Sequence, residues 1–376
     1  MRLALVRQRY SAFGGAERFV ERALPALERA GVEVTLIARS AEGWGSRRVL
    51  AADPFYVGNL WRDWSFARAA RRAWASSGFD LVQSHERIAG CDVYRAGDGV
   101  HARWLEIRRG AAGPLERLGI ALNPYHRYVC AAERRMFGHP ALRAVICNSR
   151  MVRDEIAARF GVAPRKLHVI YNGVDLERFH PDRRAELRPA ARAELGVGAG
   201  EFLFLFVGSG FARKGLDAAL AALALCDDPA LRLVAAGRDR DAARFERLAL
   251  AAGPPGRARL LGARADVLPL YAAADCFILP TRYDPFPNTA LEALAMGLPV
   301  IVGRASGAAE ILAGGGAGWV CDPGDAPGLA QLMRAAAGAA AAAGSAARRL
   351  AESYGIDAMA KRLTDLYATL AAPGAA

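Results

Sequence analysis

The sequence predicts an α/β protein with two Rossmann-like, doubly wound domains facing each other across a cleft. Its 376 residues exceed what one simple core usually holds. Short apolar runs alternate with segments of helical periodicity, which is typical of parallel βαβ units. The alternation occurs twice, and the apolar pattern lapses between the two series until about residue 202.

The first series predicts an N-terminal domain over residues 1–178. Its boundary is placed in NGVDLERFHPD (172–182), because this segment combines turn residues with a proline. A glycine turn and the helical pattern AERFVERALPALERAG follow its first strand. The strands predicted here are LALV (3–6), VEVTLIA (32–38), FDLVQSH (79–85), RAVICNS (143–149) and LHVIYNGVD (167–175).

The second series predicts a C-terminal domain over residues 179–354. The alanine-rich tract 335–347 is interpreted as a weakly specified helix. Residues 355–376 are expected to form a terminal helix that crosses back to the N-terminal domain. The strands predicted in the second domain are FLFLFVGS (202–209), LRLVAAG (231–237), ARLLG (258–262), CFILP (276–280), PVIV (299–302) and GWVCD (318–322).

Composition narrows the class of protein. The six cysteines form no CxxC pair, which favours a reducing cytosol over a zinc or disulfide framework. The sequence contains no run of about 18 apolar residues, so no membrane span is predicted. The apolar run at the start of the sequence is too short for a signal peptide. Residues 1–180 hold 29 Lys/Arg against 18 Asp/Glu, whereas residues 181–376 hold 21 against 20. The basic half predicts an anionic partner or merely reflects an arginine-rich genome; no nucleic-acid-binding motif is found.

Open α/β sheets bind ligands beyond the carboxyl ends of their strands, and the loop RYDPFPNTALEALAMGLPV (282–300) is unusual there. Two prolines stiffen it around Asp284. Asn288 is the predicted N-cap of the following helix. The first turn of such a helix attracts phosphate, and Glu292, one turn further on, can accept hydrogen bonds from two ribose hydroxyls. A rigid loop with a capped helix would explain the same residues without a ligand.

The loop GSGFARKGLDAAL after residues 202–209 predicts an anion site. Gly208 and Gly210 permit a tight turn near a ligand. Arg213 and Lys214 are expected at a helix start, where their charge opposes the helix dipole. An anion between them, most simply a diphosphate, would remove the conflict. The loop matches neither a P-loop nor a dinucleotide fingerprint.

Together these motifs resemble the retaining glycosyltransferases of family four, which have the GT-B architecture. The Asp284–Glu292 step stands where the family usually has two glutamates. The matching segments occur in the family's order over nearly the whole chain: Gly14 and Gly15, NSRMVRDEI (148–156), VIYNGVDLERFHP (169–181), VGSGFARKGLD (207–217), LYAAADCFILPTRYDPFPNTALEALAMGLPVI (270–301) and the closing ESYGID region.

The resemblance implies that the domain of residues 1–178 binds the acceptor and that the domain of residues 179–354 binds the nucleotide sugar. It also implies a role for each matching position. Arg213 and Lys214 would stabilise the leaving diphosphate, and Asp284 would contact the transferred sugar. No metal and no cofactor besides the nucleotide-sugar substrate is implied, and the DRD of 239–241 is interpreted as a surface turn. The remaining donor-binding candidates are Gly14, Gly15, Gly208, Asn288, Thr289 and Glu292.

The segment SHERIAGCDVYRAGDGVHARWLE (84–106) resembles the subgroup that adds sugars to the heptose region of the lipopolysaccharide core. The resemblance implies that Asp98 faces the reacting sugar. His85, Arg87, His101 and Arg103 are acceptor candidates, although a lone histidine at a strand end is more often structural.

The basic segment 104–137 interleaves arginines with Trp104, Leu105, Leu118, Ile120 and Leu122. We expect it to lie against the inner face of an anionic membrane; an ordinary helix pair packed on the domain is the alternative.

These observations predict a cytoplasmic, peripheral inner-membrane enzyme: a retaining hexosyltransferase that moves glucose from UDP-glucose onto a lipopolysaccharide inner-core heptose. One alternative is a transferase for capsule, exopolysaccharide or another glycolipid that uses GDP-mannose or UDP-GlcNAc. A more remote one is a non-catalytic nucleotide- or nucleic-acid-binding protein.

Overall fold

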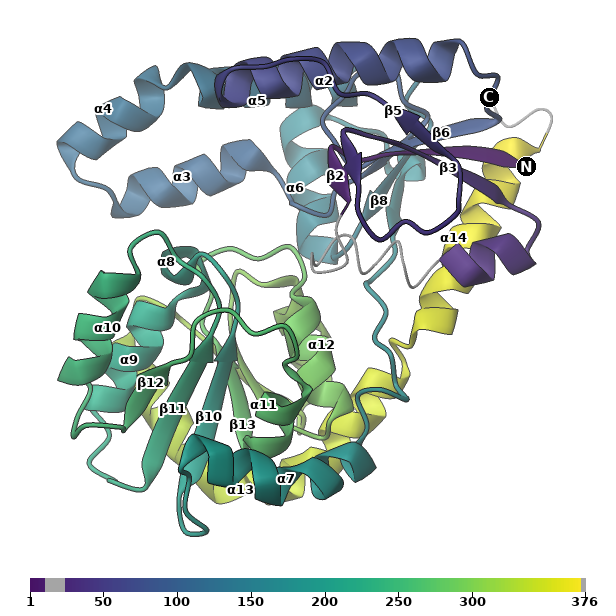
Figure 1. Ribbon diagram of the computed structural model, residues 1–376. Helices are drawn as coiled ribbons and strands as arrows, with labels where there is room; N and C mark the ends of the chain where they lie inside the picture. The colour runs from purple at the N-terminus through teal and green to yellow at the C-terminus, as the bar shows by residue number, and fades with distance from the viewer. Residues whose placement is uncertain (11–23, 373–376) are drawn as a thin grey trace. The chain divides into compact units, whose positions relative to one another are not determined.

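The computed structural model describes residues 1–10 and 24–372, which form two compact units (Figure 1). Unit 1 comprises Met1–Asn172 and Asp357–Ala376, and unit 2 comprises Gly173–Ile356. The terminal helix α14 (Ile356–Ala371) therefore belongs, but for its first residue, to unit 1. Each unit is a parallel sheet with helices on both faces, so the predicted class of two doubly wound α/β domains is confirmed.

Unit 1 contains a seven-stranded sheet of order β5-β3-β1-β6-β7-β8-β9. Its neighbouring strands pair in parallel. A two-stranded sheet, β2-β4, stands apart from it. The strands are β1 (Arg2–Val6), β2 (Arg9–Tyr10), β3 (Glu33–Ala38), β4 (Ser40–Ala41), β5 (Val49–Ala51), β6 (Leu81–Ser84), β7 (Val93–Arg95), β8 (Ala144–Cys147) and β9 (Leu167–Val169).

Side chains alternate across this sheet and bury both of its faces. Leu3 and Leu5 of β1 join a core cluster with Leu363 and Tyr367 of α14, whereas Ala4 and Val6 join a second cluster on the opposite face. Residues of α2, α3, α5 and α6 complete the second cluster. Besides α14, unit 1 contains the helices α2 (Gly58–Ala75), α3 (His101–Ala111), α4 (Pro114–Leu122), α5 (Pro124–Phe137), α6 (Arg150–Phe160) and the short η1 (Pro164–Lys166).

Unit 2 contains a six-stranded parallel sheet of order β12-β11-β10-β13-β14-β15. Its six strands lie where the sequence predicts them. The strands are β10 (Phe202–Val207), β11 (Leu231–Ala236), β12 (Ala258–Leu260), β13 (Cys276–Leu279), β14 (Val300–Gly303) and β15 (Gly318–Cys321). The helices are α7 (Pro181–Leu195), α8 (Phe211–Lys214), α9 (Leu216–Ala224), α10 (Ala242–Ala251), α11 (Leu268–Ala273), α12 (Asn288–Ala295), η2 (Gly307–Gly314) and α13 (Ala326–Glu352).

Helix α7 occupies the stretch in which the apolar pattern lapses. It is held by three arginines, one per turn, in place of an apolar stripe. Arg184 and Arg188 donate to the carbonyl of Ala274 at 2.8 Å each, and Arg192 pairs with Asp275 at 3.0 Å. These donors satisfy carbonyls at the end of α11 that the helix itself leaves unpaired. The boundary between the two units lies before α7, between Asn172 and Gly173.

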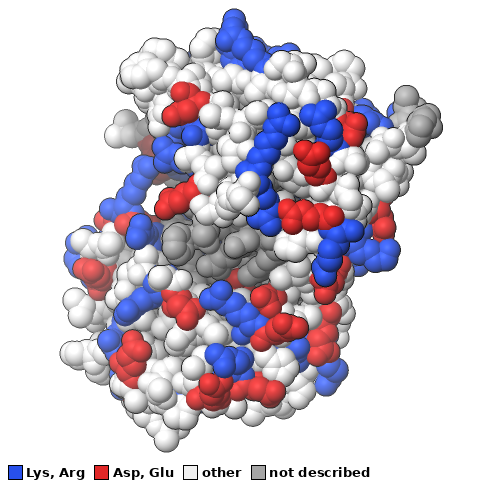
Figure 2. Space-filling view, turned by 45° about the vertical axis from the view of Figure 1, so that its right-hand side comes forward, with Lys and Arg blue, Asp and Glu red and all other residues white. Residues whose placement is uncertain are grey.

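Charges are interspersed on the face drawn in Figure 2, where Lys and Arg lie beside Asp and Glu. Within the described residues, no helix combines the length and the apolar character that crossing a membrane requires.

Candidate active site

Two loops that the sequence singles out lie next to each other in unit 2, because they follow the paired strands β10 and β13. Thr281 Oγ1 donates to the carbonyl of Arg213 at 3.0 Å, and the Arg282 amide donates to the same oxygen at 2.9 Å. The Arg282 guanidinium also binds both carboxylate oxygens of Asp217, at 2.8 and 2.9 Å. The carboxyl ends of the two strands thus form one hydrogen-bonded platform.

Glycine at two positions lets these loops approach each other closely. Gly215 has φ +80°, and a Cβ there would lie 1.9 Å from the carbonyl oxygen of Pro280. A Cβ at Gly237 would lie 2.0 Å from the carbonyl oxygen of Gly208. Any other residue at either position would force the backbones apart.

Gly215 also changes the interpretation of Arg213 and Lys214. Its left-handed conformation ends α8 after one turn, so the two cations lie in the last turn of α8 and precede α9. The expected clash of both charges with the dipole of a single helix is therefore wrong, because positive charge is favourable at the end of α8. The argument for an anion must rest on the surroundings of these side chains.

The Lys214 ammonium forms an ion pair with the Asp284 carboxylate, and the two side chains are 14% and 7% exposed. Arg213 Nη1 donates to the carbonyl of Tyr283, next to that aspartate, at 3.1 Å. The Asp284 backbone is fixed by hydrogen bonds with Ala305 and Gly307. Two cations and a carboxylate from separate loops are thereby held together in a largely buried setting.

Glu292 is fully buried in α12, and Tyr271 Oη of α11 donates to its Oε2 at 3.1 Å. The same hydroxyl lies 3.2 Å from the carbonyl oxygen of Thr289. Tyr271 was missed from the sequence, because it stands within an apolar helix and gives no local signal. Asn288 is the first helical residue and Pro287 takes the N-cap position, so the predicted cap was one residue out.

Asp239 of the DRD turn has a structural role that the sequence did not reveal. Its carboxylate accepts from the Phe211 amide at 2.5 Å and from the Asp241 amide at 2.9 Å. It therefore fixes the start of α8, the turn that carries Arg213 and Lys214.

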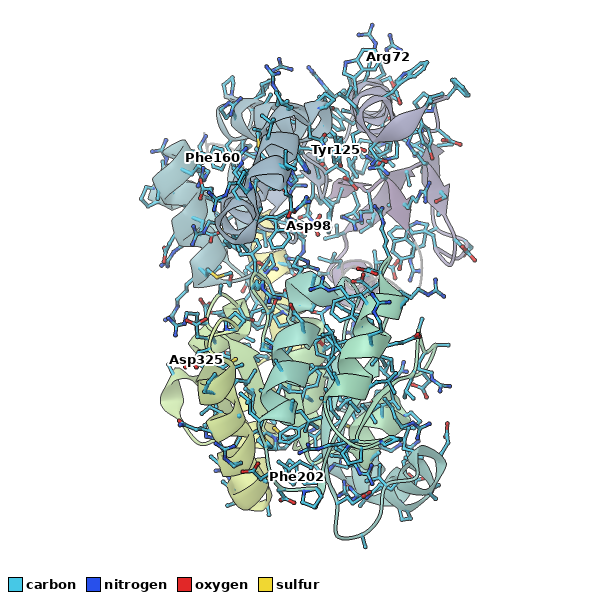
Figure 3. The ribbon with its side chains drawn as sticks, turned by 90° about the vertical axis from the view of Figure 1, so that its left-hand side faces the viewer. Arg72, Asp98, Tyr125, Phe160, Phe202 and Asp325 are labelled. Carbon is cyan, nitrogen blue, oxygen red and sulfur yellow. The ribbon has the colours of Figure 1, made fainter. Side chains whose placement is uncertain are left out.

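In unit 1, the acceptor candidates gather after strands β6 and β7, and Glu133 of α5 organises them. This buried carboxylate accepts from Arg87 Nε at 2.9 Å and from the His101 amide at 2.7 Å. Arg87 Nη2 also donates to the carbonyl of Gly99 at 3.3 Å. Asp98, labelled in Figure 3, is exposed beside this network. Glu133 thus holds Arg87, the start of α3 and the Asp98 turn in place.

Both histidines among the candidates are kept neutral. His85 lies 3.0 Å from Gln83 Nε2, and Tyr367 of α14 donates to Gln83 Oε1 at 2.6 Å. Burial, then the charges of Arg95 and Arg7, holds the pKa of His85 well below its usual value. Burial also lowers the pKa of His101 to about 4, and its Nε2 lies 3.1 Å from His126 Nδ1.

The same edge of the sheet contains two groups that the sequence did not single out. Arg95, at the end of β7, is 3% exposed and donates to Asn172 Oδ1 at 2.5 Å. Burial lowers its pKa to about 9. Glu86 accepts from the Gln8 amide at 3.0 Å, and burial raises its pKa. Strand β7 has only three residues and ends in arginine, which hid it within a polar stretch.

The remaining candidates are Arg103, Gly14 and Gly15. Arg103 is on the exposed side of α3, where it pairs with Glu106 at 3.5 Å and Glu155 at 3.6 Å. Gly14 and Gly15 lie outside the described residues.

Comparison with known proteins links both units to one family. Residues 13–178 match the model described as Glycosyltransferase Family 4, and residues 188–338 match the model Glycosyl transferases group 1. A D-inositol 3-phosphate glycosyltransferase from Streptomyces bingchenggensis is 30% identical, over 81% of this chain and 70% of its own. The lipopolysaccharide core biosynthesis glycosyltransferase LpsE of Rhizobium meliloti is 27% identical, over 85% and 84% of the two chains.

Solved structures share the fold over almost the whole chain. WaaG, a glycosyltransferase involved in lipopolysaccharide biosynthesis, has a TM-score of 0.84 at 23% identity, covering 97% of this chain and 99% of its own. Anabaena HepE in complex with UDP-glucose has a TM-score of 0.72 at 21% identity, covering 98% and 100%. The two parallel sheets, the platform of unit 2 and these matches together show that the chain is a member of glycosyltransferase family four with the GT-B fold.

Proposed function

We propose that this glycosyltransferase is a retaining, metal-independent enzyme that moves glucose from UDP-glucose onto a heptose of the lipopolysaccharide inner core. The observation that carries the donor half is the buried Lys214–Asp284 ion pair on the same platform as Glu292. The likeness to HepE, whose structure holds UDP-glucose, supports the donor. The relatives LpsE and WaaG support the acceptor.

The donor roles follow from charge and placement. Lys214 and Arg213 would neutralise the diphosphate as it leaves, which pre-placed cations do best in a site shielded from water. Glu292, oriented by the Tyr271 hydroxyl, would accept hydrogen bonds from the ribose hydroxyls. Asp284 would contact the transferred sugar while keeping Lys214 in position.

The proposed reaction replaces one bond at the anomeric carbon by another on the same face. The bond from that carbon to the diphosphate oxygen breaks as the bond to the acceptor hydroxyl oxygen forms. The acceptor proton passes to the leaving phosphate oxygen. This front-face route requires no covalent intermediate on a side chain, in contrast to the retaining two-carboxylate scheme of glycosidases.

We further propose that α4 brings unit 1 to the inner face of the membrane. Leu115, Leu118 and Leu122 are 87%, 56% and 64% exposed, whereas Ile120 of the same helix is buried against Leu105. The neighbouring arginines are partly engaged, since Arg108 pairs with Glu116 at 3.0 Å. Exposed leucines beside basic residues are typical of interfacial helices.

A second candidate function is favoured by one comparison. Some relatives are described as D-inositol 3-phosphate glycosyltransferases. They favour an alternative in which the acceptor is a phosphorylated cyclitol instead of a core heptose and the donor is a different sugar nucleotide.

A thermal-shift panel of UDP, GDP, ADP and their sugar conjugates tests the donor proposal. A ligand at about 100 times its dissociation constant adds roughly 2.7 kcal/mol to the state that binds it. UDP and UDP-glucose should raise the melting temperature, and Lys214→Ala should abolish the rise. A rise with GDP conjugates alone would replace the donor, and no rise with any nucleotide would overturn the assignment of the platform.

A further inference from the structure

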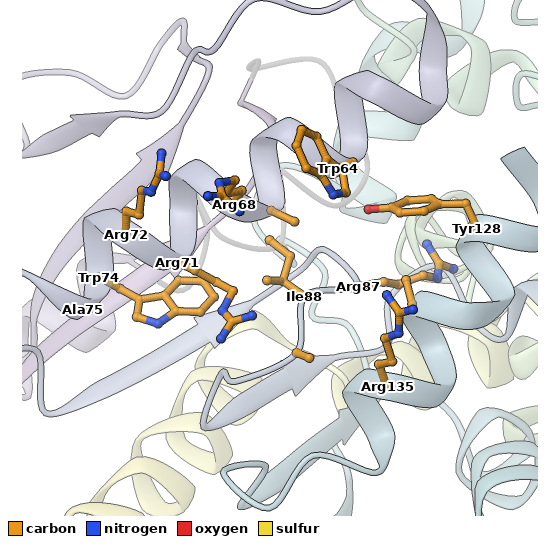
Figure 4. A pocket seen from close by; sticks show the side chains of 13 residues that line it. Trp64, Arg68, Arg71, Arg72, Trp74, Ala75, Arg87, Ile88, Tyr128 and Arg135 are labelled. Atoms are coloured by element: carbon orange, nitrogen blue, oxygen red, sulfur yellow. The ribbon is translucent and has the colours of Figure 1, made fainter.

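Unit 1 contains a cavity of about 530 Å³ between α2, α5 and the turn after β6 (Figure 4). Five arginines line it, and no acidic side chain does. Aromatic side chains complete its wall. The lining residues that the argument uses are Trp64, Arg68, Arg71, Arg87, Tyr128 and Arg135.

The cavity is built from two facing helical stripes. Trp64, Arg68 and Arg71 are spaced four and three residues apart on α2, so they share one face of that helix. Tyr128 and Arg135 are spaced two turns apart on α5 and share a face likewise. Figure 4 shows Trp64 and Tyr128 at the same end of the cavity, with Arg71 and Arg135 farther along.

The positive charge of this cavity is poorly balanced within the chain. Glu133 pairs with Arg87 at 2.9 Å. In the described part of the chain, Arg68, Arg71 and Arg135 have no carboxylate within ion-pair distance. Like charges that converge on a concave surface repel each other and concentrate the field there. An anion that entered the cavity would therefore reduce this repulsion.

We propose that this cavity binds a phosphorylated saccharide, with the phosphate held by the arginines and a sugar ring against Trp64 and Tyr128. Guanidinium groups bind phosphate through paired charged hydrogen bonds. Aromatic faces offer a sugar ring apolar contact, and the volume is in the range of small-ligand pockets. Where the proposed transferase function holds, this ligand is a phosphorylated part of the acceptor; the binding itself is carried by unit 1 alone.

Arg87 connects the cavity to the candidate acceptor site. It lines the cavity, pairs with Glu133 and donates to the carbonyl of Gly99, the residue after Asp98. Arg72, at the far end of the cavity, lies well away from Asp98 (Figure 3). A phosphate near Arg87 would thus bind beside the Asp98 turn and leave Asp98 itself accessible.

Isothermal titration of the full chain, without any nucleotide, tests the proposal. The probes are glucose 6-phosphate, glucose, inorganic phosphate and phosphatidylglycerol vesicles, each in a separate titration. We expect glucose 6-phosphate to bind at least about tenfold more tightly than glucose or inorganic phosphate, which is the scale of one charged hydrogen bond or one aromatic contact.

Matched variants locate the binding. Arg71→Ala with Arg135→Ala removes one cavity arginine from each helix and should weaken glucose 6-phosphate binding at least about tenfold. Arg127→Ala with Arg134→Ala removes the same charge from positions of α5 outside the cavity and should leave the affinity for glucose 6-phosphate unchanged. Trp64→Ala should remove the preference for glucose 6-phosphate over inorganic phosphate. Melting temperatures show that each variant is folded.

Three results would overturn the proposal: no binding of glucose 6-phosphate, equal losses in the two double variants, or binding of vesicles alone, which would assign the cavity to lipid headgroups. None of them bears on the donor platform, because the nucleotide panel reports on unit 2. A chain that binds UDP-glucose but no sugar phosphate would lose this inference and keep the proposed function.

Discussion

Lys214 and Asp284 form an ion pair that joins the loops after two adjacent strands, β10 and β13. Lys214→Ala leaves the Asp284 carboxylate buried without this cation, so it should cost about 3 kcal/mol of stability and lower the melting temperature by roughly 6–12 °C. Transfer should fall at least about a hundredfold, because the leaving diphosphate loses its countercharge.

The double variant Lys214→Met with Asp284→Asn separates these two effects. Replacing both charges removes the unpaired carboxylate, so the melting temperature should recover while transfer stays lost. Recovery of transfer together with stability would show that the pair is only structural.

Glu292→Ala should weaken UDP binding about tenfold, the scale of a charged hydrogen bond. Tyr271→Phe removes the hydroxyl that orients Glu292 and should weaken UDP binding by a smaller factor. Calorimetric titration with UDP measures both. An unchanged affinity in Glu292→Ala would remove the ribose assignment, whatever the effect on stability.

Glu133→Gln tests the organisation of unit 1. The substitution keeps the shape of the side chain and removes the charge that holds Arg87 and caps α3, so we expect a loss of about 2 kcal/mol. Acceptor-dependent turnover should fall together with stability, whereas the affinity for UDP should remain that of the wild type. A parallel loss of UDP affinity would contradict a role confined to unit 1.

His101 predicts a dependence of stability on pH. Its pKa is about 4 in the folded chain and about 6.5 in an unfolded one. The unfolded state therefore binds the extra proton, and stability falls as pH decreases from about 6.5 to 4, by up to about 3 kcal/mol. Urea midpoints of His101→Gln should fall less over this range than those of the wild type. If NMR showed that His101 itself titrates near pH 6.5, its pKa would not be lowered and this prediction would be wrong.

The leucines of α4 predict membrane binding. Leu115→Ser with Leu122→Ser should weaken binding to phosphatidylglycerol vesicles about tenfold or more, because each buried leucine contributes roughly 1.5–3 kcal/mol. Leu225→Ser with Leu250→Ser changes two exposed leucines of unit 2 and serves as the control. Equal effects in sedimentation with vesicles would mean that α4 has no special part in binding.

The sequence predicts the sheets well because most of their strands are local apolar runs. All six strands of unit 2 lie where the sequence predicts them. It fails where contacts join residues far apart in the chain. Glu133 reaches Arg87 across 46 residues and Tyr271 reaches Glu292 across 21. Helix α7 was missed for a related reason, since its arginines bind carbonyls about 85 residues away and leave no apolar stripe. Arg213 and Lys214 were predicted at a helix start, because spacing alone does not show the positive φ of Gly215 that ends α8.

The position of α14 has a consequence for the order in which the chain folds during synthesis. Tyr367 and Leu363 complete a core cluster of unit 1, so its first 172 residues leave the ribosome with one face of their sheet incompletely covered. Unit 2 is continuous in sequence and can finish folding first. We therefore expect the usual order of N-terminal domain before C-terminal domain to be reversed here, with unit 1 exposing apolar surface until α14 has been synthesised.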